Sequence, residues 1–139
     1  MWGLPVRCSS TVSVRVWKRD PNAVLSRLQA WAEQLGEDPE ILAVVLFGSL
    51  ARGEATAASD ADVLIVLRDS VEEFGERMVR YKPIGLGVSV EVFPYTLDEA
   101  RRTLRDGHGV IGAALREGRV LFPRGRGQEA VGELMNAPV

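Results

Sequence analysis

The length, composition and charge of the chain exclude several classes of protein. It has 139 residues, which suits one compact domain. Hydrophobic residues make up 46% and charged residues 26% of the sequence, which is the composition of a globular chain and excludes a disordered one. The formal net charge of −2 gives no electrostatic case for nucleic-acid binding, so we expect no direct contact with nucleic acid.

Cysteine content and hydropathy indicate where the protein works. Cys8 is the single cysteine, which excludes an internal disulfide and a zinc site built from thiolates. No apolar run approaches the roughly 18–20 residues that cross a bilayer. The first ten residues lack the basic and apolar regions of a signal peptide. The sequence therefore predicts a cytoplasmic protein with no membrane partner.

The first third of the chain predicts a strand and then a helix. Residues 11–17, TVSVRVW, alternate with period two and predict an extra edge strand, with a mobile leader as the alternative. Asp20 then suits an N-cap and Pro21 a first helical position, and Gly36 is a natural helix end. Between them one helical stripe is apolar: Val24, Leu28, Trp31 and Leu35.

Three strands and one helix are predicted in the middle of the chain. Residues 41–47 and 63–67 are continuous apolar runs, typical of strands that are covered on both faces. Residues 88–93 alternate, with three valines on one side and Glu91 on the other. Ser70 and Glu73 have the spacing of a capping box, which predicts a helix from residue 70 to about Tyr81.

The last third of the chain continues the alternation of predicted helices and strands. Thr96 and Glu99 form a second capping-box pattern, which predicts a helix to about Arg105. A further helix is predicted over 110–117 and a short strand over 119–122, followed by a tail over 123–139. Helices and strands that alternate without repeats or a linker predict one domain over 1–139, of the α/β (α+β) class, with a mixed sheet flanked by helices.

Two aspartates at the head of an apolar strand predict a metal site. Residues i and i+2 of a strand face the same way, so Asp60 and Asp62 are expected to project together. Carboxylates this close repel unless a cation lies between them, and oxygen ligands favour Mg²⁺ or Mn²⁺. Glu91, on another strand, has the chemistry of a third ligand, but its orientation depends on a sheet order that periodicity does not supply.

A phosphate site is predicted beside these acids. Gly48 and Ser49 follow a buried strand and precede a short helical segment. Glycine allows close approach to the backbone, and free N–H groups at a helix start attract phosphate, with the Ser49 hydroxyl as a further donor. Arg52, one turn later, could reach the same anion. The combination predicts a nucleoside triphosphate bound through its metal, with Glu91 or an aspartate accepting a proton from the attacking hydroxyl.

These residues resemble a known family. Gly48, Ser49, ten residues, then Asp60, Ala61 and Asp62 fit the G-S-x(10)-D-x-D signature of the DNA polymerase β-like nucleotidyltransferase superfamily, and are most similar to its minimal branch. The resemblance implies a nucleotidyltransferase fold. It also implies that Gly48 and Ser49 hold phosphates, that Asp60 and Asp62 bind metal, and that Glu91 completes the site in place of a more usual aspartate.

The same resemblance implies a partner. Members of the minimal branch commonly pair with a helical HEPN-type protein in toxin–antitoxin systems, and transfer AMP from ATP to a tyrosine of that protein. Two alternatives stay open: a non-catalytic binding module of the same fold, and an adenylyltransferase for a small molecule resembling an aminoglycoside. The sequence leaves the acceptor, the base preference and the oligomeric state, including a homo-oligomer, undecided.

Overall fold

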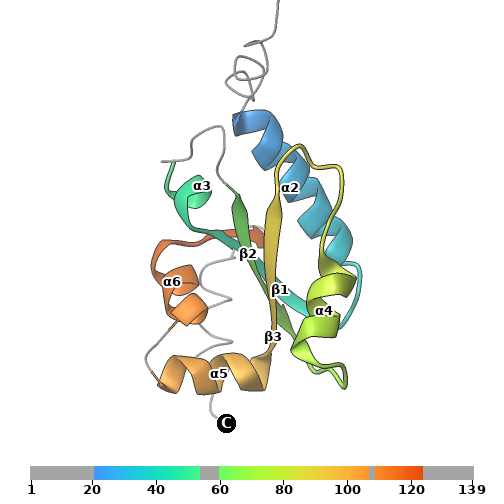
Figure 1. The fold of residues 1–139 in the computed structure, drawn as a ribbon, viewed down its shortest axis with the longest axis vertical. Helices are drawn as coiled ribbons and strands as arrows, with labels where there is room; N and C mark the ends of the chain where they lie inside the picture. The colour runs from blue at the N-terminus through green and yellow to red at the C-terminus, as the bar shows by residue number, and fades with distance from the viewer. Residues whose placement is uncertain (1–20, 54–59, 107–108, 124–139) are drawn as a thin grey trace, which may run out of the picture.

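A four-stranded mixed sheet forms the centre of the molecule (Figure 1). The structure is a computed structural model that describes residues 21–53, 60–106 and 109–123. The strand order is β3-β2-β1-β4, in which β1 pairs antiparallel with both β2 and β4, whereas β2 and β3 are parallel. In chain order the strands are β1 (Ile41–Phe47), β2 (Ala61–Leu67), β3 (Val90–Thr96) and β4 (Arg119–Phe122).

Helices cover both faces of this sheet, in agreement with the predicted fold class (Figure 1). Side chains of α2 and α4 pack with the odd-numbered residues of β2 on one face. Side chains of α5 and α6 pack with the even-numbered residues of β2 on the other face. The helices are α2 (Pro21–Leu35), the single turn α3 (Ser49–Arg52), α4 (Phe74–Tyr81), α5 (Leu97–Arg105) and α6 (Gly109–Glu117).

Most of the predicted elements are confirmed within one to three residues. The helix that begins at Pro21 ends at Leu35, and Gly36 follows it in tight contact with the ring of Phe122. The capping box of Thr96 and Glu99 is present at the start of α5. The predictions for residues 11–17, for Asp20 and for the tail beyond Pro123 lie outside the described residues.

The helix predicted from residue 70 starts four residues later, at Phe74. Glu73 is its N-cap and forms a capping box with Glu76, so the prediction that Ser70 and Glu73 form the box was wrong. The Ser70 hydroxyl instead accepts a hydrogen bond from the Glu72 amide at 3.1 Å, which is a local turn. The observed box has the same three-residue spacing one helical turn further along the chain, but with a glutamate at the N-cap, which is not among the residues preferred there.

The third strand is shifted toward the C-terminus relative to the prediction, running from Val90 to Thr96 and passing through Pro94. A proline removes one backbone donor, which would break a central strand. β3 is an edge strand, and the Pro94 nitrogen lies on the side away from β2, so that no ladder hydrogen bond is lost. Within the described part of the chain, no helix is long and apolar enough to span a bilayer.

Candidate active site

The turn after β1 has a backbone that requires glycine. Gly48 has φ 82° and ψ −162°, a region that L-residues with a side chain avoid. A Cβ at this position would lie 2.5 Å from Oδ2 of Asp62. The Gly48 carbonyl accepts from the Arg52 amide at 3.1 Å and so starts α3. Gly48 therefore both makes the turn and leaves room for the Asp62 carboxylate beside it.

Asp62 and Glu91 lie side by side on the two parallel strands. Asp62 of β2 is in register with Glu91 of β3, and with Phe47 of β1 on its other side. Residues in register on neighbouring strands share a face, so both carboxylates lie on the face that α5 and α6 cover. Phe93 is the next residue of β3 on the same face, and its ring contacts that of Phe47, with centroids 5.7 Å apart. These rings give Asp62 an apolar neighbour.

This setting raises the pKa of the Asp62 carboxyl above its usual value of 3.8. The largest cause is burial, because the carboxyl loses water at the end of the sheet. The charges of Glu91 and then of Asp60 raise the pKa further. Asp60 is exposed and stands one residue before β2, so the three acids gather around the same end of two parallel strands. A cation would relieve this accumulation of negative charge.

The donor set fits a hard divalent cation that is bound jointly with substrate phosphates. Among residues 21–53, 60–106 and 109–123, no group of three or more histidine, cysteine, aspartate or glutamate side chains is arranged to hold a metal ion by itself. Mg²⁺ commonly needs only one or two carboxylates, because waters and substrate phosphates supply its other oxygen ligands. Asp62 and Asp60 match that pattern, and the role of Glu91 as a third ligand stays a prediction.

Arg52, predicted to reach a phosphate, has a protein partner in the structure. Its Nη1 donates to both carboxylate oxygens of Glu117, each at 2.9 Å, and so joins α3 to the end of α6. Both side chains are partly exposed, at 39% and 30%. Arg52 thus lies at the edge of the candidate site with its guanidinium held by Glu117. The two residues are 65 positions apart, so spacing along the sequence carries no signal of this pair.

Ser49 is half-buried directly after Gly48, at the first position of α3. Within the residues that the structure describes, its hydroxyl has no hydrogen-bond partner. The structure therefore brings Gly48, Ser49, Asp60, Asp62 and Glu91 to one end of the sheet. Of the predicted site residues, Arg52 is the one that is already engaged in an ion pair.

Solved structures share this fold. A crystal structure described as a candidate nucleotidyltransferase from Sulfolobus solfataricus superposes with a TM-score of 0.53 at 20% identity, covering 87% of this chain and 94% of that one. A second structure, of a toxin–antitoxin with AMP-PNP, gives a TM-score of 0.49 at 18% identity, covering 84% of each chain. The first supports the fold, and the second is too distant to carry an argument. No curated protein matches the sequence significantly.

The sequence itself matches a family over most of the elements that build the site. Residues 28–106 match the nucleotidyltransferase domain, a span that reaches from α2 through β1, β2 and β3 to the end of α5. It includes Gly48, Ser49 and all three acids, and it covers more than half of the chain. This chain belongs to the nucleotidyltransferase domain family.

Proposed function

We propose that the protein is a metal-dependent nucleotidyltransferase that transfers AMP from ATP to a hydroxyl group. The observation that carries the proposal is the position of Asp62, which lies against the Gly48 turn on one side and beside Glu91 on the other. A phosphate-binding turn and a metal-binding carboxylate must be adjacent if one nucleotide is to contact both. Membership of the nucleotidyltransferase family supports this assignment.

Each residue of the site has a role in this proposal. The Gly48 and Ser49 backbone and the Ser49 hydroxyl bind the triphosphate, and Arg52 adds a cation at the edge. Asp60 and Asp62 hold Mg²⁺ or Mn²⁺ together with phosphate oxygens. The bound ion supplies charge neutralisation at the α-phosphate and at the departing pyrophosphate.

The chemical step exchanges one bond at the α-phosphorus for another. The acceptor oxygen forms a bond to the α-phosphorus, and the bond from that phosphorus to the bridging oxygen of the β-phosphate breaks. Pyrophosphate leaves with the electron pair of the broken bond. Glu91, or one of the aspartates, takes the proton that the acceptor hydroxyl loses.

The acceptor that we propose is a tyrosine of a HEPN-type helical protein, which would make this chain the antitoxin of a toxin–antitoxin pair. This part rests on the resemblance of the Gly48 to Asp62 motif to the minimal branch of the superfamily. The described residues form little more than the sheet and the helices that cover it. A hydroxyl on a separate protein is therefore the simplest acceptor to propose.

Label transfer tests the proposal. The protein is incubated with α-labelled ATP, Mg²⁺ or Mn²⁺, and the HEPN-type protein of the adjacent gene, with the other three nucleotides in parallel. We expect label on a tyrosine of the partner, lost in the Asp60→Asn/Asp62→Asn variant and without metal. A folded wild-type protein that transfers no label from any nucleotide would refute the activity. A double variant that still silences the partner fully would instead support the non-catalytic binding module.

A further inference from the structure

The loop between α4 and β3, residues 82–89, leads directly into the candidate site. It ends at Ser89, whose carbonyl accepts from the Ala61 amide of β2 at 2.8 Å. Ala61 is the residue between the two candidate aspartates, and Glu91 follows two residues after Ser89. This hydrogen bond is therefore the contact at which the loop joins the acids of β2 to the acid of β3.

Glycines give this loop considerable backbone freedom. Gly85 and Gly87 both have a positive φ, of 81° and 79°. A loop with two glycines loses more conformational entropy when it is ordered than one without them. Within residues 83–88, the Leu86 carbonyl is the one backbone group that has a hydrogen-bond partner in the described part of the chain. The group that binds this carbonyl therefore limits the freedom of the loop.

Arg27 of α2 binds the Leu86 carbonyl where the loop passes over this helix (Figure 1). Its Nη1 donates to the carbonyl oxygen at 3.2 Å. The same nitrogen lies against the next residue, because a Cβ built on Gly87 would be 2.7 Å from it. The guanidinium is thus seated on the bare backbone of Gly87 while it binds the carbonyl of Leu86. Only glycine allows both the positive φ and this close approach.

Apolar packing of the loop fixes which way Glu91 points. Val88 packs against the core cluster that α2 and α4 share with the sheet, and Val90 is buried in the same cluster. Alternate residues of an extended chain point to opposite faces, so Glu91 turns to the other face, where Asp62 lies. The position of the loop on the α2 face therefore sets the position of Glu91 on the face of the candidate site.

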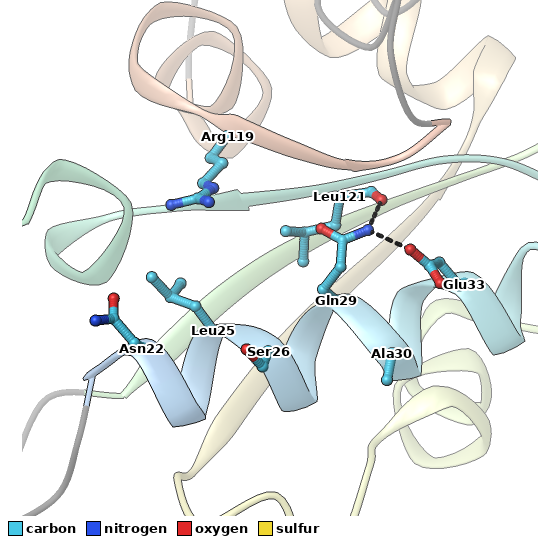
Figure 2. A pocket seen from close by; sticks show the side chains of 8 residues that line it. All are labelled: Asn22, Leu25, Ser26, Gln29, Ala30, Glu33, Arg119 and Leu121. Atoms are coloured by element: carbon cyan, nitrogen blue, oxygen red, sulfur yellow. Dashed lines mark hydrogen bonds between the residues drawn. The ribbon is translucent and has the colours of Figure 1, made fainter.

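The helix α2 is a firm support for the loop because its other side is bound to β4. Figure 2 shows Gln29 reaching from α2 to that strand, in the groove of about 500 Å³ between them. Its Nε2 donates to the Leu121 carbonyl at 2.7 Å. At about 100° per residue, side chains two positions apart point in nearly opposite directions. Gln29 thus binds one edge of the sheet, and Arg27 binds the loop that enters the strand at the other edge.

The contact between Ser89 and Ala61 is at the end of the described β2–β3 ladder. Strand pairing opens most easily at such ends, where few contacts oppose local opening. Opening at this end would move Glu91 away from the aspartates, because it is the second residue of β3. A side chain that restrains the loop just before this point therefore acts on the arrangement of the acids.

We propose that Arg27 is a positioning residue of the candidate site, which holds the loop backbone at Leu86 and Gly87 and thereby keeps Glu91 beside Asp62. This inference rests on the proposed nucleotidyl transfer for the role of the two carboxylates. It adds a residue on the opposite face of the sheet, which touches neither the nucleotide nor the metal in that proposal.

Hydrogen exchange tests the positioning without relying on activity. Arg27→Met removes the donor of the Leu86 carbonyl but keeps an apolar stem, so we expect the Ala61 amide to exchange about fivefold faster. The amide of Ile65, in the middle of β2, should change less than about twofold. An equal change at both amides would indicate a general loss of stability and would overturn the proposal. An unchanged rate at Ala61 would overturn it as well.

The two loop glycines supply a second test with a matched control. Gly87→Ala puts a methyl group against the Arg27 guanidinium and should also speed exchange at Ala61 about fivefold. Gly85→Ala is made at a similar positive φ, but nothing lies within 4 Å of its Cβ position, so exchange should change less than about twofold. The double variant Arg27→Met/Gly87→Ala should exchange at a rate close to that of Gly87→Ala alone, because both changes break one contact. Equal effects of the two glycine changes, or additive effects in the double variant, would overturn the proposal.

The kinetics of AMP transfer connect this contact to the candidate site. Arg27→Met should lower kcat about tenfold, because Glu91 is displaced from its place beside Asp62. The KM for ATP should change less than about twofold, because the Gly48 turn that binds the triphosphate is unaltered. Arg27→Lys keeps a donor for the Leu86 carbonyl and should bring kcat to within about threefold of the wild type. A raised KM with unchanged kcat would place Arg27 in nucleotide binding and would overturn the proposal.

Separate readouts distinguish this proposal from the proposed activity. A wild-type protein that transfers no AMP, but whose Ala61 amide is selectively released by Arg27→Met, would refute the activity and leave the positioning contact in place. A wild-type protein that transfers AMP, with kcat and KM unchanged in Arg27→Met, would refute the positioning role and leave the activity in place.

Discussion

Arg77 and Glu99 form a bidentate ion pair that joins α4 to α5. Nη1 and Nη2 of Arg77 lie 2.7 Å and 2.9 Å from the two carboxylate oxygens of Glu99. Arg77 is 4% exposed, and its other donors bind the carbonyls of Glu72 and Pro94. Four hydrogen bonds from this buried guanidinium hold two helices and the edge strand together.

The first prediction is that this pair makes stability depend on acid pH. The hydrogen bond from Arg77 lowers the pKa of Glu99 from 4.5 to about 2. A lowered pKa in the folded state gives stability that is present above pH 4.5 and is lost as pH falls toward 2. Because Glu99 is 31% exposed, we expect a loss of about 2 kcal/mol after allowing for solvent screening. Unfolding by urea at pH 6, 4 and 2.5 measures this loss of stability, and the Glu99→Gln variant should not show it.

A second prediction concerns the cost of removing the guanidinium. Arg77→Met leaves the Glu99 carboxylate and two carbonyl groups without their donor, so we expect a loss of about 3 kcal/mol in the free energy of unfolding. The control is Arg102→Met, since Arg102 pairs with Asp98 on the exposed surface of α5. That change should cost no more than about 0.5 kcal/mol. Equal losses in the two variants, measured by chemical unfolding, would contradict the role of Arg77.

The third prediction separates backbone strain from steric overlap at the glycines. Gly48→Ala places a Cβ against the Asp62 carboxylate in a backbone region that favours glycine, so we expect a loss of about 2 kcal/mol or more. Gly53 also has a positive φ, of 76°, but nothing lies within 4 Å of its Cβ position. Gly53→Ala should therefore cost about 1 kcal/mol. Nucleotide transfer should be lost in the first variant and retained in the second, because only Gly48 touches Asp62.

A fourth prediction is that the Asp62 carboxylate, which the proposed activity requires, lowers the stability of the folded protein. Its raised pKa means that ionisation is costly in the folded state, so the contribution of Asp62 to stability is greatest below pH 3.8 and declines as pH rises through the folded-state pKa of Asp62. Asp62→Asn should raise the melting temperature at pH 7 and abolish transfer. The stability control is Glu37→Gln. Glu37 lies in the turn before β1, at the end of that strand that is far from Phe47. Unchanged or lower melting of Asp62→Asn at pH 7 would contradict the burial of an unfavourable charge.

Mg²⁺ with a non-hydrolysable ATP analogue tests the same site by binding. Ligand binding to the folded state raises the melting temperature in proportion to the logarithm of the ligand concentration. We expect this rise for the wild-type protein and a much smaller one for Asp62→Asn. A rise of the same size in both proteins, observed by thermal shift, would place the nucleotide or its metal elsewhere.

The sequence predicts the elements of this fold well because their signals are local. The apolar runs of β1 and β2 and the capping box of α5 depend on neighbours within a few residues, and all three are confirmed. The prediction for the start of α4 was wrong because the N-cap is Glu73, three residues after Ser70, and glutamate is not among the preferred N-cap residues. The local pattern therefore favoured the serine.

Features that depend on pairing between distant residues were not predictable. Arg77 lies in a segment rich in charged residues and would be read as exposed, yet α4 turns it toward Pro94 and Glu99. The partner of Arg52 lies on α6, and no spacing rule connects the two residues. For the candidate site, the motif predicted which residues belong to it. That Asp62 and Glu91 lie side by side follows only from the strand order, which the sequence does not supply.

The parallel pairing of β2 with β3 makes the site sensitive to alignment during folding. Glu91 shares a face with Asp62 because Ala61 is paired with Val90, and alternate residues of a strand point to opposite faces. A slip of one residue would carry Glu91 to the α2 and α4 side and place a valine beside Asp62. Such a misaligned sheet would put a charged side chain into the core, so this acid of the candidate site also opposes the wrong alignment.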